Sequence, residues 1–164
     1  MSISLIAAVA DNGVIGDRGA IPWDLPADRR HFRALTWGKL LVVGRGTWAA
    51  MGGALPGRET WVLSRQPLGL GVPVFASVDA VLAAWHARAA PDAELMVIGG
   101  AQVYRAFWAR AERIYLTEVR ERPLGDAWFP PVLPAHWQEV ARSAQAADAR
   151  HACDYQFVEY QRRE

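Results

Sequence analysis

The chain has very little cysteine, and this excludes proteins that are held together by disulfides. With 1 Cys among 164 residues, no disulfide can form within the chain. A lone cysteine is typical of the reducing cytoplasm, so we expect a cytoplasmic protein. No catalytic motif flanks Cys153, which favours a spectator thiol over a nucleophile.

The chain also lacks an excess of charge of either sign. Its 18 basic and 17 acidic residues leave a formal net charge of +1, and Lys39 is its single lysine. Nucleic-acid-binding proteins usually carry a broad basic field, so this balance gives no support for such a partner. Any anionic ligand must therefore be bound by a few individually placed arginines.

Long apolar runs and metal-ligand spacings are missing as well. The apolar run Ile3–Ala10 is too short to cross a bilayer, and Asp11-Asn12-Gly13 follows it directly. No basic segment precedes the run, so a buried strand is favoured over a secretory signal, and we expect no membrane association. No metal site is expected either, because the four histidines are far apart: His31, His86, His136 and His151.

Apolar strands alternate with helical segments along the rest of the chain. The expected strands are Ile3–Ala10, Lys39–Gly44, Glu59–Ser64, Val72–Ala76, Glu94–Ile98, Arg113–Val119, Trp137–Arg142 and Asp154–Gln161. The expected helices are Pro26–Leu35, Gly46–Met51, a helix capped by Ser77 that runs to Ala89, and Ala101–Ala109. This alternation predicts an α/β fold in a single domain, 1–164, with a mostly parallel central sheet, helices on both faces and a C-terminal antiparallel hairpin.

Two of the expected strands end in glycine where a helix begins. The segments are Gly44-Arg45-Gly46-Thr47 and Gly99-Gly100-Ala101-Gln102-Val103-Tyr104. Unpaired N–H groups at a helix start suit a phosphate, and two such turns on one sheet could hold a dinucleotide pyrophosphate. The alternative is that each glycine merely ends a strand. Neither a GxGxxG fingerprint nor a GK[ST] motif is present, so a dinucleotide would bind outside the Rossmann scheme.

Arginines follow two strand ends. Arg45 comes after Gly44, and Arg65 comes after Ser64. Together with the Ser64 hydroxyl, two arginines could bind a ribose 2′-phosphate, which would select NADPH over NADH. Taken singly, each is more often an ordinary surface arginine.

Asp28 and Arg58 are candidates for contact with substrate. Asp28 lies in the first turn of the Pro26 helix, after Trp23 and one turn before Phe32. A carboxyl between aromatic rings would be desolvated, and its pKa would rise. The alternative is that Asp28 is present only because a negative charge in the first turn interacts favourably with the helix dipole. Arg58 follows the Pro56-Gly57 turn, where a fixed guanidinium suits a carboxylate, but a surface role is the alternative.

Asp11–Asp24 is expected to be a long mobile loop. It carries Ile15, Ile21 and Trp23 among several glycines. Apolar side chains on a flexible loop fit a lid that closes over a flat ring. The alternative is a surface loop that these side chains anchor to the core.

In this order, the motifs resemble the bacterial type of dihydrofolate reductase over nearly the whole chain. The matching segments are Ile3–Ala8, Gly13–Gly16, Ile21–Asp28, Gly44–Trp48, Leu55–Arg58, Leu63–Arg65, Val97–Gly100, Val103–Tyr104 and Leu116–Thr117. The resemblance implies reduction of 7,8-dihydrofolate to 5,6,7,8-tetrahydrofolate by NADPH, with hydride going to C6 and a proton to N5. It also implies a monomer that binds antifolate inhibitors.

The same resemblance implies roles for individual residues. The catalytic group would be Asp28 with Thr117 and Trp23. The substrate would contact Ile6, Ala8, Phe32, Arg33, Met51, Leu55, Arg58 and Ile98. NADPH would contact Ala8, Val14, Ile15, Gly16, Ala20, Ile21, Gly44, Arg45, Gly46, Thr47, Leu63, Ser64, Arg65, Gly99, Gly100, Ala101, Gln102, Val103 and Tyr104. The family pattern further implies a cis peptide at Gly99-Gly100 and a hydrogen bond from Asp126 to the mobile loop.

Two other functions remain open from the sequence. One is a pyrimidine or pterin reductase on the same fold, such as the reductase domain of riboflavin synthesis, whose substrate has no glutamate tail for Arg58 to bind. The other is a non-catalytic nucleotide-binding module, which would bind NADPH without turnover.

Overall fold

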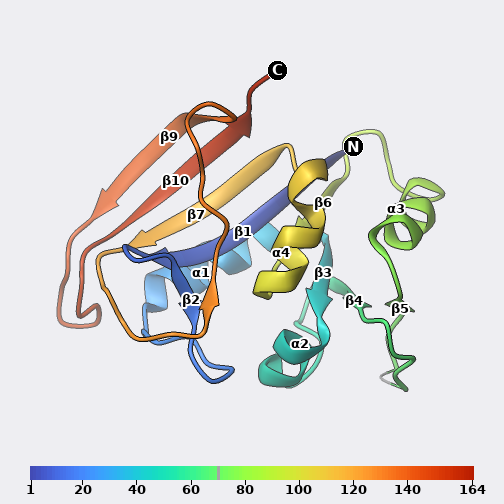
Figure 1. Cartoon of the computed structure of the whole chain (residues 1–164), viewed down its shortest axis with the longest axis horizontal. Coiled ribbons are helices and arrows are strands. Elements are labelled where there is room, and N and C mark those ends of the chain that lie inside the picture. Colours follow the sequence, from blue (N-terminus) through green and yellow to red (C-terminus); the bar gives the residue numbers. More distant parts are fainter. Residues whose placement is uncertain (70) are drawn as a thin grey trace.

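The computed structural model describes residues 1–69 and 71–164, and its centre is a twisted sheet (Figure 1). In the described residues this sheet has eight strands in the order β5-β4-β3-β6-β1-β7-β10-β9. Their bounds are β1 Ser2–Ala10, β3 Leu40–Gly44, β4 Glu59–Leu63, β5 Val74–Phe75, β6 Glu94–Val97, β7 Arg113–Val119, β9 Trp137–Gln145 and β10 Tyr155–Arg162. β1 lies between β6 and β7, which explains why it is mostly apolar.

Six of these strands run parallel, and the last two reverse direction. β1 pairs in parallel with β6 and β7, β3 pairs in parallel with β6 and β4, and β4 does so with β5. β10 is antiparallel to both β7 and β9. The predicted α/β fold with a C-terminal antiparallel hairpin is confirmed, and all six parallel strands end at the same edge of the sheet.

Helices cover both faces of the sheet because alternate residues of each inner strand point to opposite sides. Leu5 of β1 and Val42 of β3 belong to the larger core, under α3 (Val78–His86) and α4 (Ala101–Phe107). Ile6 and Leu41, their sequence neighbours, belong to a second core cluster. Phe32 of α1 (Pro26–Thr36) packs against that second cluster on the other face.

Several element ends differ from the sequence prediction: β9, for example, extends to Gln145 instead of ending at Arg142. Three of the differences have a local physical reason. The fourth strand has only two residues, Val74–Phe75, because Pro73 has no N–H for the ladder. The helix expected to reach Ala89 ends at His86, and Pro91 follows after a turn.

The helix predicted over Ala101–Ala109 is the third case. It ends at Phe107, and a 3₁₀ turn, η1 (Trp108–Arg110), follows. The Trp108 ring packs edge-on against Phe129 and Trp137, which favours the tighter turn.

The prediction of one long mobile loop over Asp11–Asp24 missed a strand within it. A short strand, β2 (Val14–Gly16), lies within it and pairs with β8 (Ala127–Trp128). A side chain at Gly125 would lie 2.3 Å from a Val14 methyl, so only glycine permits this close approach. The first half of the loop is therefore held to the segment between β7 and β9.

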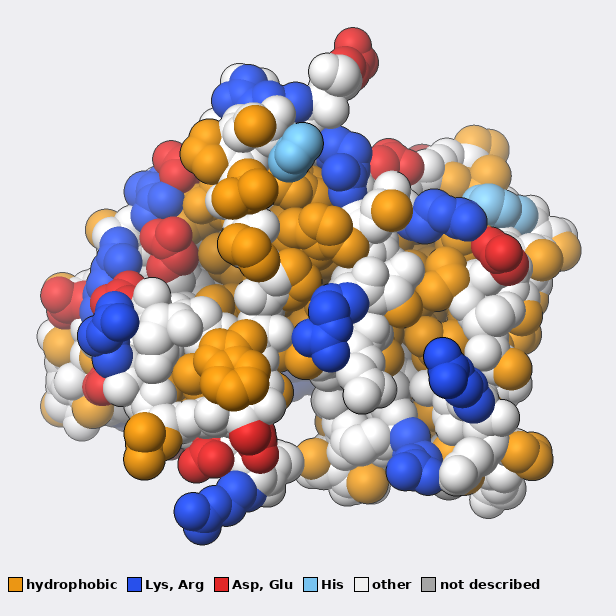
Figure 2. Space-filling model, in the orientation of Figure 1, with side chains coloured by type: hydrophobic (Ala, Val, Ile, Leu, Met, Phe, Trp, Pro, Cys, Tyr) orange, Lys and Arg blue, Asp and Glu red, His pale blue; other side chains and the backbone are white. Residues whose placement is uncertain are grey.

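The surface carries acidic and basic groups side by side rather than in fields of one sign. Figure 2 shows them interspersed along the face formed by β9 and β10. Arg142 there pairs with Glu118 and Glu139, both at 2.5 Å. No helix in residues 1–69 and 71–164 is long and apolar enough to span a membrane.

Candidate functional site

Asp28 and Thr117 meet at the edge of the sheet where the parallel strands end. Asp28 lies in the first turn of α1, and Thr117 lies near the end of β7 and is 3% exposed. The Thr117 hydroxyl donates a 2.6 Å hydrogen bond to Asp28 Oδ1. Elements that are far apart in the sequence therefore bring together the two residues that the resemblance had paired.

Burial makes the charged form of Asp28 less favourable than it is in water. Burial raises the pKa of the Asp28 carboxyl, although the Thr117 hydrogen bond and the nearby His31 and Arg29 oppose the shift. Burial lowers the pKa of His31, which stacks on Phe157 with ring centroids 3.9 Å apart. Asp28 is thus a partly desolvated carboxyl close to the stacked rings of His31 and Phe157.

Helix α1 connects this carboxyl to a pair of arginines. At a rise of 1.5 Å per residue, Asp28 and Thr36 are about 12 Å apart along the helix axis. Between them, Phe32 and Leu35 pack against the same apolar cluster as Leu55 and Ile98. The Thr36 hydroxyl then accepts a hydrogen bond from Arg58 at 3.2 Å.

The two arginines at this end of α1 share one indole ring. The guanidinium carbon of Arg33 lies 4.9 Å from the Trp37 ring centroid, and that of Arg58 lies 5.6 Å away. Burial and the charge of Arg33 lower the pKa of Arg58. In the described part of the chain, no carboxylate pairs with either guanidinium, so both are available to an anion.

The two glycine turns lie against each other. Gly44 N–H donates to the Gly99 carbonyl at 2.8 Å, and a side chain on Gly44 would lie 2.8 Å from a Val103 methyl. The peptide between Gly99 and Gly100 is cis, as the family pattern implied. Helices α2 (Arg45–Met51) and α4 both begin here without a side-chain cap, so unpaired N–H groups gather at this edge.

A third group of polar residues follows β4. Arg45 donates a 2.7 Å hydrogen bond to the Gln66 side chain, and Gln66 N–H donates to the Ser64 hydroxyl at 3.2 Å. Arg65 is exposed beside them. The structure therefore brings Arg45, Ser64 and Arg65 to one place, as expected, and adds Gln66.

The loop that follows β2 is tied to the segment ahead of β8. Arg18 N–H donates to the Asp126 carboxylate at 3.1 Å, and Asp126 N–H donates to the Gly16 carbonyl at 3.0 Å. The implied hydrogen bond between Asp126 and the loop is therefore present. Ile21, farther along, is 65% exposed and can move without losing core contacts. Figure 2 shows a notch at the lower edge of the molecule, between the side that carries β2 and the side that carries α2.

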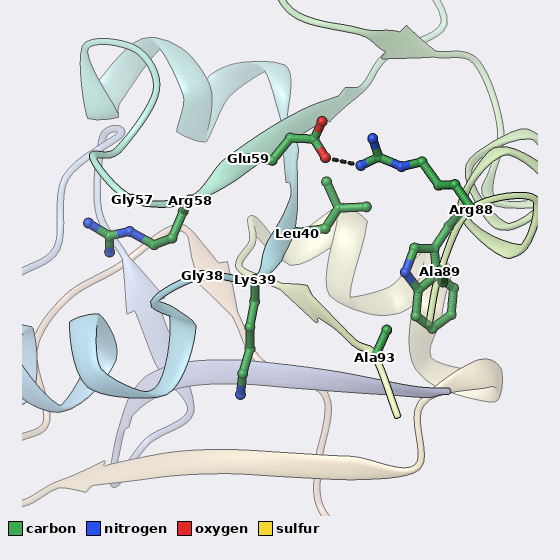
Figure 3. Close-up of a pocket in the computed structure, with 10 residues that line it drawn as sticks. Gly38, Lys39, Leu40, Gly57, Arg58, Glu59, Arg88, Ala89 and Ala93 are labelled. Carbon is green, nitrogen blue, oxygen red and sulfur yellow. Dashed lines mark hydrogen bonds and ion pairs between the residues drawn. The ribbon is translucent and has the colours of Figure 1, made fainter. Parts of the chain in front are cut away.

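A shallow pocket of about 360 Å³ lies at the opposite edge, where β3 and β4 begin. Lys39, Glu59, Trp85 and Arg88 line it (Figure 3). Arg88 is paired with Glu59 across the pocket, and the Arg58 guanidinium points away from it. Gly57 and Arg58 also line this pocket, so it adjoins the Arg58 end of the site, whereas Asp28 lies at the other end of α1. Across residues 1–69 and 71–164, no group of three His, Cys, Asp or Glu could hold a metal.

Most of the expected site residues lie along one edge, but the sequence reasoning missed three neighbours. His31 and Gln66 had local signals, since they follow Asp28 by three residues and Arg65 by one. His151 had none, although its ring contacts the first turn of α1 from the far end of the chain. Cys153, interpreted from the sequence as a spectator thiol, is buried and packs with Tyr155.

Comparison with known proteins gives one consistent family. The profile described as dihydrofolate reductase matches residues 2–162. A dihydrofolate reductase type 3 from Salmonella typhimurium is 45% identical, covering 99% of this chain and 100% of that protein. A dihydrofolate reductase from Neisseria meningitidis is 38% identical, with 99% of both chains covered.

A solved structure agrees with these relatives. Dihydrofolate reductase from Enterococcus faecalis, complexed with NADP(H) and RAB-propyl, superposes with a TM-score of 0.90 at 31% identity. The match covers 99% of this chain and 97% of that one. The two glycine turns, Asp28 and Arg58 therefore lie in a fold for which a cofactor complex is known.

Proposed function

The chain belongs to the dihydrofolate reductase family and catalyses the NADPH-dependent reduction of dihydrofolate to tetrahydrofolate, and we propose that Asp28 is its acidic group against the pterin ring. The observation that carries this proposal is the partly desolvated Asp28 carboxyl, to which Thr117 donates from β7. That hydrogen bond engages one carboxylate oxygen and leaves lone pairs free. A ring carrying an amino group next to a ring N–H can donate to both oxygens at once.

The length of α1 supports an assignment for the rest of the substrate. The pterin lies at Asp28, the aromatic linker lies over Phe32, and the glutamate tail reaches Arg58 about 12 Å farther along the helix. Arg58 binds the α-carboxylate of the tail. Arg33, whose guanidinium also lies against the Trp37 ring, assists in binding this carboxylate. The remaining residues assigned to this pocket are Ile6, Ala8, Met51, Leu55 and Ile98.

The cofactor is assigned to the notch beside the glycine turns. The N–H groups at the starts of α2 and α4 bind the pyrophosphate, while Arg45, Ser64 and Arg65 bind the 2′-phosphate. Ala8 and the loop would contact the nicotinamide, and Trp23 is assigned to the catalytic group with Asp28 and Thr117. Further assigned contacts are Val14, Ile15, Gly16, Ala20, Ile21, Gly44, Gly46, Thr47, Leu63, Gly99, Gly100, Ala101, Gln102, Val103 and Tyr104.

Bound NADPH supplies the hydride that C6 of the pterin accepts. The protein holds the two rings face to face and excludes water from between them. N5 lies on the side of the ring away from Asp28, so its proton arrives through water. Asp28 then increases the basicity of the ring instead of protonating N5 directly.

We further propose that residues 1–164 form one domain and act as a cytoplasmic monomer. The family profile matches residues 2–162, and the match to a relative of 45% identity covers all of that relative. The single cysteine, buried and free, fits a reducing compartment. Antifolates are expected to compete with dihydrofolate at the Asp28 site.

The decisive test is single-turnover hydride transfer in Asp28→Asn. We expect the rate at neutral pH to fall by about 10²–10⁴-fold, the usual contribution of an acid–base group. Asp79→Asn is the control, because Asp79 also lies in the first turn of a helix, α3, but its side chain is exposed. An unchanged rate in Asp28→Asn would refute the assignment. The same assay with NADH in place of NADPH tests the arginine site at the 2′-phosphate.

A further inference from the structure

The first turn of α1, which carries Asp28, has an unusual cap. Leu25 precedes the helix and provides no side-chain acceptor for its free N–H groups. Ala27 N–H instead donates to His151 Nε2 at 3.0 Å, across 124 positions of sequence. The residue next to Asp28 is thus held by the turn between β9 and β10.

His151 is held rigidly from behind. Its Nδ1 lies 2.7 Å from Asp148 Oδ1, and its backbone exchanges hydrogen bonds with the backbone of Asp148. Arg150 N–H donates to the same carboxylate oxygen at 2.8 Å. The His151 ring is 4% exposed and lies 5.1 Å from the ring of Tyr155.

These contacts define which ring nitrogen carries the proton. Nε2 accepts a hydrogen bond from a backbone N–H, so it has a free lone pair. The proton of the neutral ring is then on Nδ1, where it is donated to Asp148. Asp148 therefore selects the tautomer that can cap the helix.

We propose that His151, oriented by Asp148, is a positioning residue that fixes the Asp28 carboxyl for reduction of the pterin. Thr117 holds the tip of the Asp28 side chain, and His151 holds the backbone from which that side chain extends. Without the cap the first helical turn frays, and the Asp28 carboxylate is no longer held at the position that the pterin ring requires. A displacement of about 1 Å in such a site can cost on the order of 10²-fold in rate. This inference rests on the proposed role of Asp28.

The variants are His151→Ala, His151→Gln and Asp148→Ala. His151→Ala is expected to slow hydride transfer by about 10–100-fold and to shift the pH–rate profile. His151→Gln places an amide oxygen near the position of Nε2 and should restore the rate to within about threefold. Asp148→Ala keeps the ring but frees its tautomer, so an intermediate loss is expected even if His151→Ala does not fold. His136→Ala, at an exposed histidine, is the control.

Two outcomes would overturn the proposal. One is a His151→Ala enzyme that melts earlier but transfers hydride at the wild-type rate and with the wild-type pH profile, which would leave only a structural role. The other is equal loss in His151→Ala and His151→Gln. In the Asp28→Asn background, His151→Ala should cause little further loss, because the two residues act as one unit.

A direct spectroscopic measurement separates this proposal from the role of Asp28. In ¹⁵N-labelled wild-type protein, a through-bond coupling between the Ala27 amide nitrogen and His151 Nε2 is expected across the hydrogen bond. A protonated Nε2, or no coupling, would contradict the capping geometry whatever Asp28 does. If the coupling is present while Asp28→Asn remains fully active, the cap stands, and the proposed function of Asp28 fails.

Discussion

Two partly buried carboxyls, Asp28 and Glu94, lie at opposite edges of this sheet, and their surroundings differ. Asp28, where the parallel strands end, receives one hydrogen bond, from Thr117. Glu94, where they begin, accepts from Ser4 and Lys39 at 2.5 Å each and from Tyr115 at 3.0 Å. The hydrogen-bonding capacity of the Glu94 carboxylate is therefore satisfied within the folded protein, whereas Asp28 can still accept hydrogen bonds from a ligand.

The directions of the two pKa shifts follow from this difference. Burial pushes both pKa values upward. At Glu94 the hydrogen bonds from Lys39 and Ser4 outweigh burial, and the pKa lies below its ordinary value. At Asp28 burial dominates, and the pKa is raised. A raised pKa on an underpaired carboxyl in a cleft is typical of functional sites, while a lowered one within a full network is typical of structural sites.

Replacing Glu94 should produce the largest change in stability. Glu94→Leu leaves the hydroxyl of fully buried Ser4 and the Lys39 ammonium without their acceptor. We expect the free energy of unfolding, measured in urea, to fall by about 3–5 kcal/mol. Hydride transfer per folded molecule should not change. Glu139→Leu, on the exposed face of β9, should stay within about 0.5 kcal/mol of the wild type. A loss of catalysis without a loss of stability in Glu94→Leu would break the contrast.

Replacing Arg58 tests whether the contrast between a fully paired and an underpaired group also holds for the basic side chains. Lys39 and Arg113 are paired with Glu94. Within residues 1–69 and 71–164, the Arg58 side chain donates hydrogen bonds only to Pro56 O and the Thr36 hydroxyl. We expect Arg58→Gln to raise the dissociation constant of dihydrofolate by about 10–100-fold, because a charged hydrogen bond is worth about 1.5–3 kcal/mol. Fluorescence titration measures this constant.

The control for Arg58→Gln comes from the neighbouring pocket. Arg88→Gln removes a guanidinium that already pairs with Glu59, so substrate affinity should be unaffected. A pterin without a glutamate tail should bind equally to wild type and Arg58→Gln. If Arg58→Gln raised the dissociation constants of both ligands equally, Arg58 would not be the residue that binds the glutamate tail.

The smallest predicted effect is a gain in stability from Asp28→Asn. Because the folded-state pKa of Asp28 lies above the ordinary value of 3.8, folding favours the protonated form. Below about pH 4 the carboxyl is protonated in both states and carries no penalty. As pH rises through the raised pKa, the wild type loses stability, and the amide variant does not.

Thermal unfolding of wild type and Asp28→Asn across pH measures this difference. At neutral pH the variant should be more stable by about 0.5–2 kcal/mol, the usual gain when a functional group that strains the fold is removed. The gain should vanish in acid. A gain that grows as pH falls would have the wrong sign and would mean that Asp28 is stabilised as a carboxylate.

Local patterns in the sequence predicted much of the fold and the main candidates for the site. Ile3–Ala10 and Glu94–Ile98 are strongly apolar and were predicted within one residue at each end. β2 and β8 were missed because their pairing joins three-residue and two-residue segments that have no alternation of their own. Asp28 was found from its aromatic neighbours, but its partner Thr117 came only from the family resemblance.

The sequence by itself determined the order of strands and helices, because hydrophobic period, glycine and proline act over a few residues. It also placed Asp28 in a first helical turn and glycines after two strands. Only the tertiary structure decided which distant groups meet them. The Thr117 bond, the His151 cap and the donors around Glu94 connect residues tens of positions apart, and such contacts depend on how the sheet and helices pack.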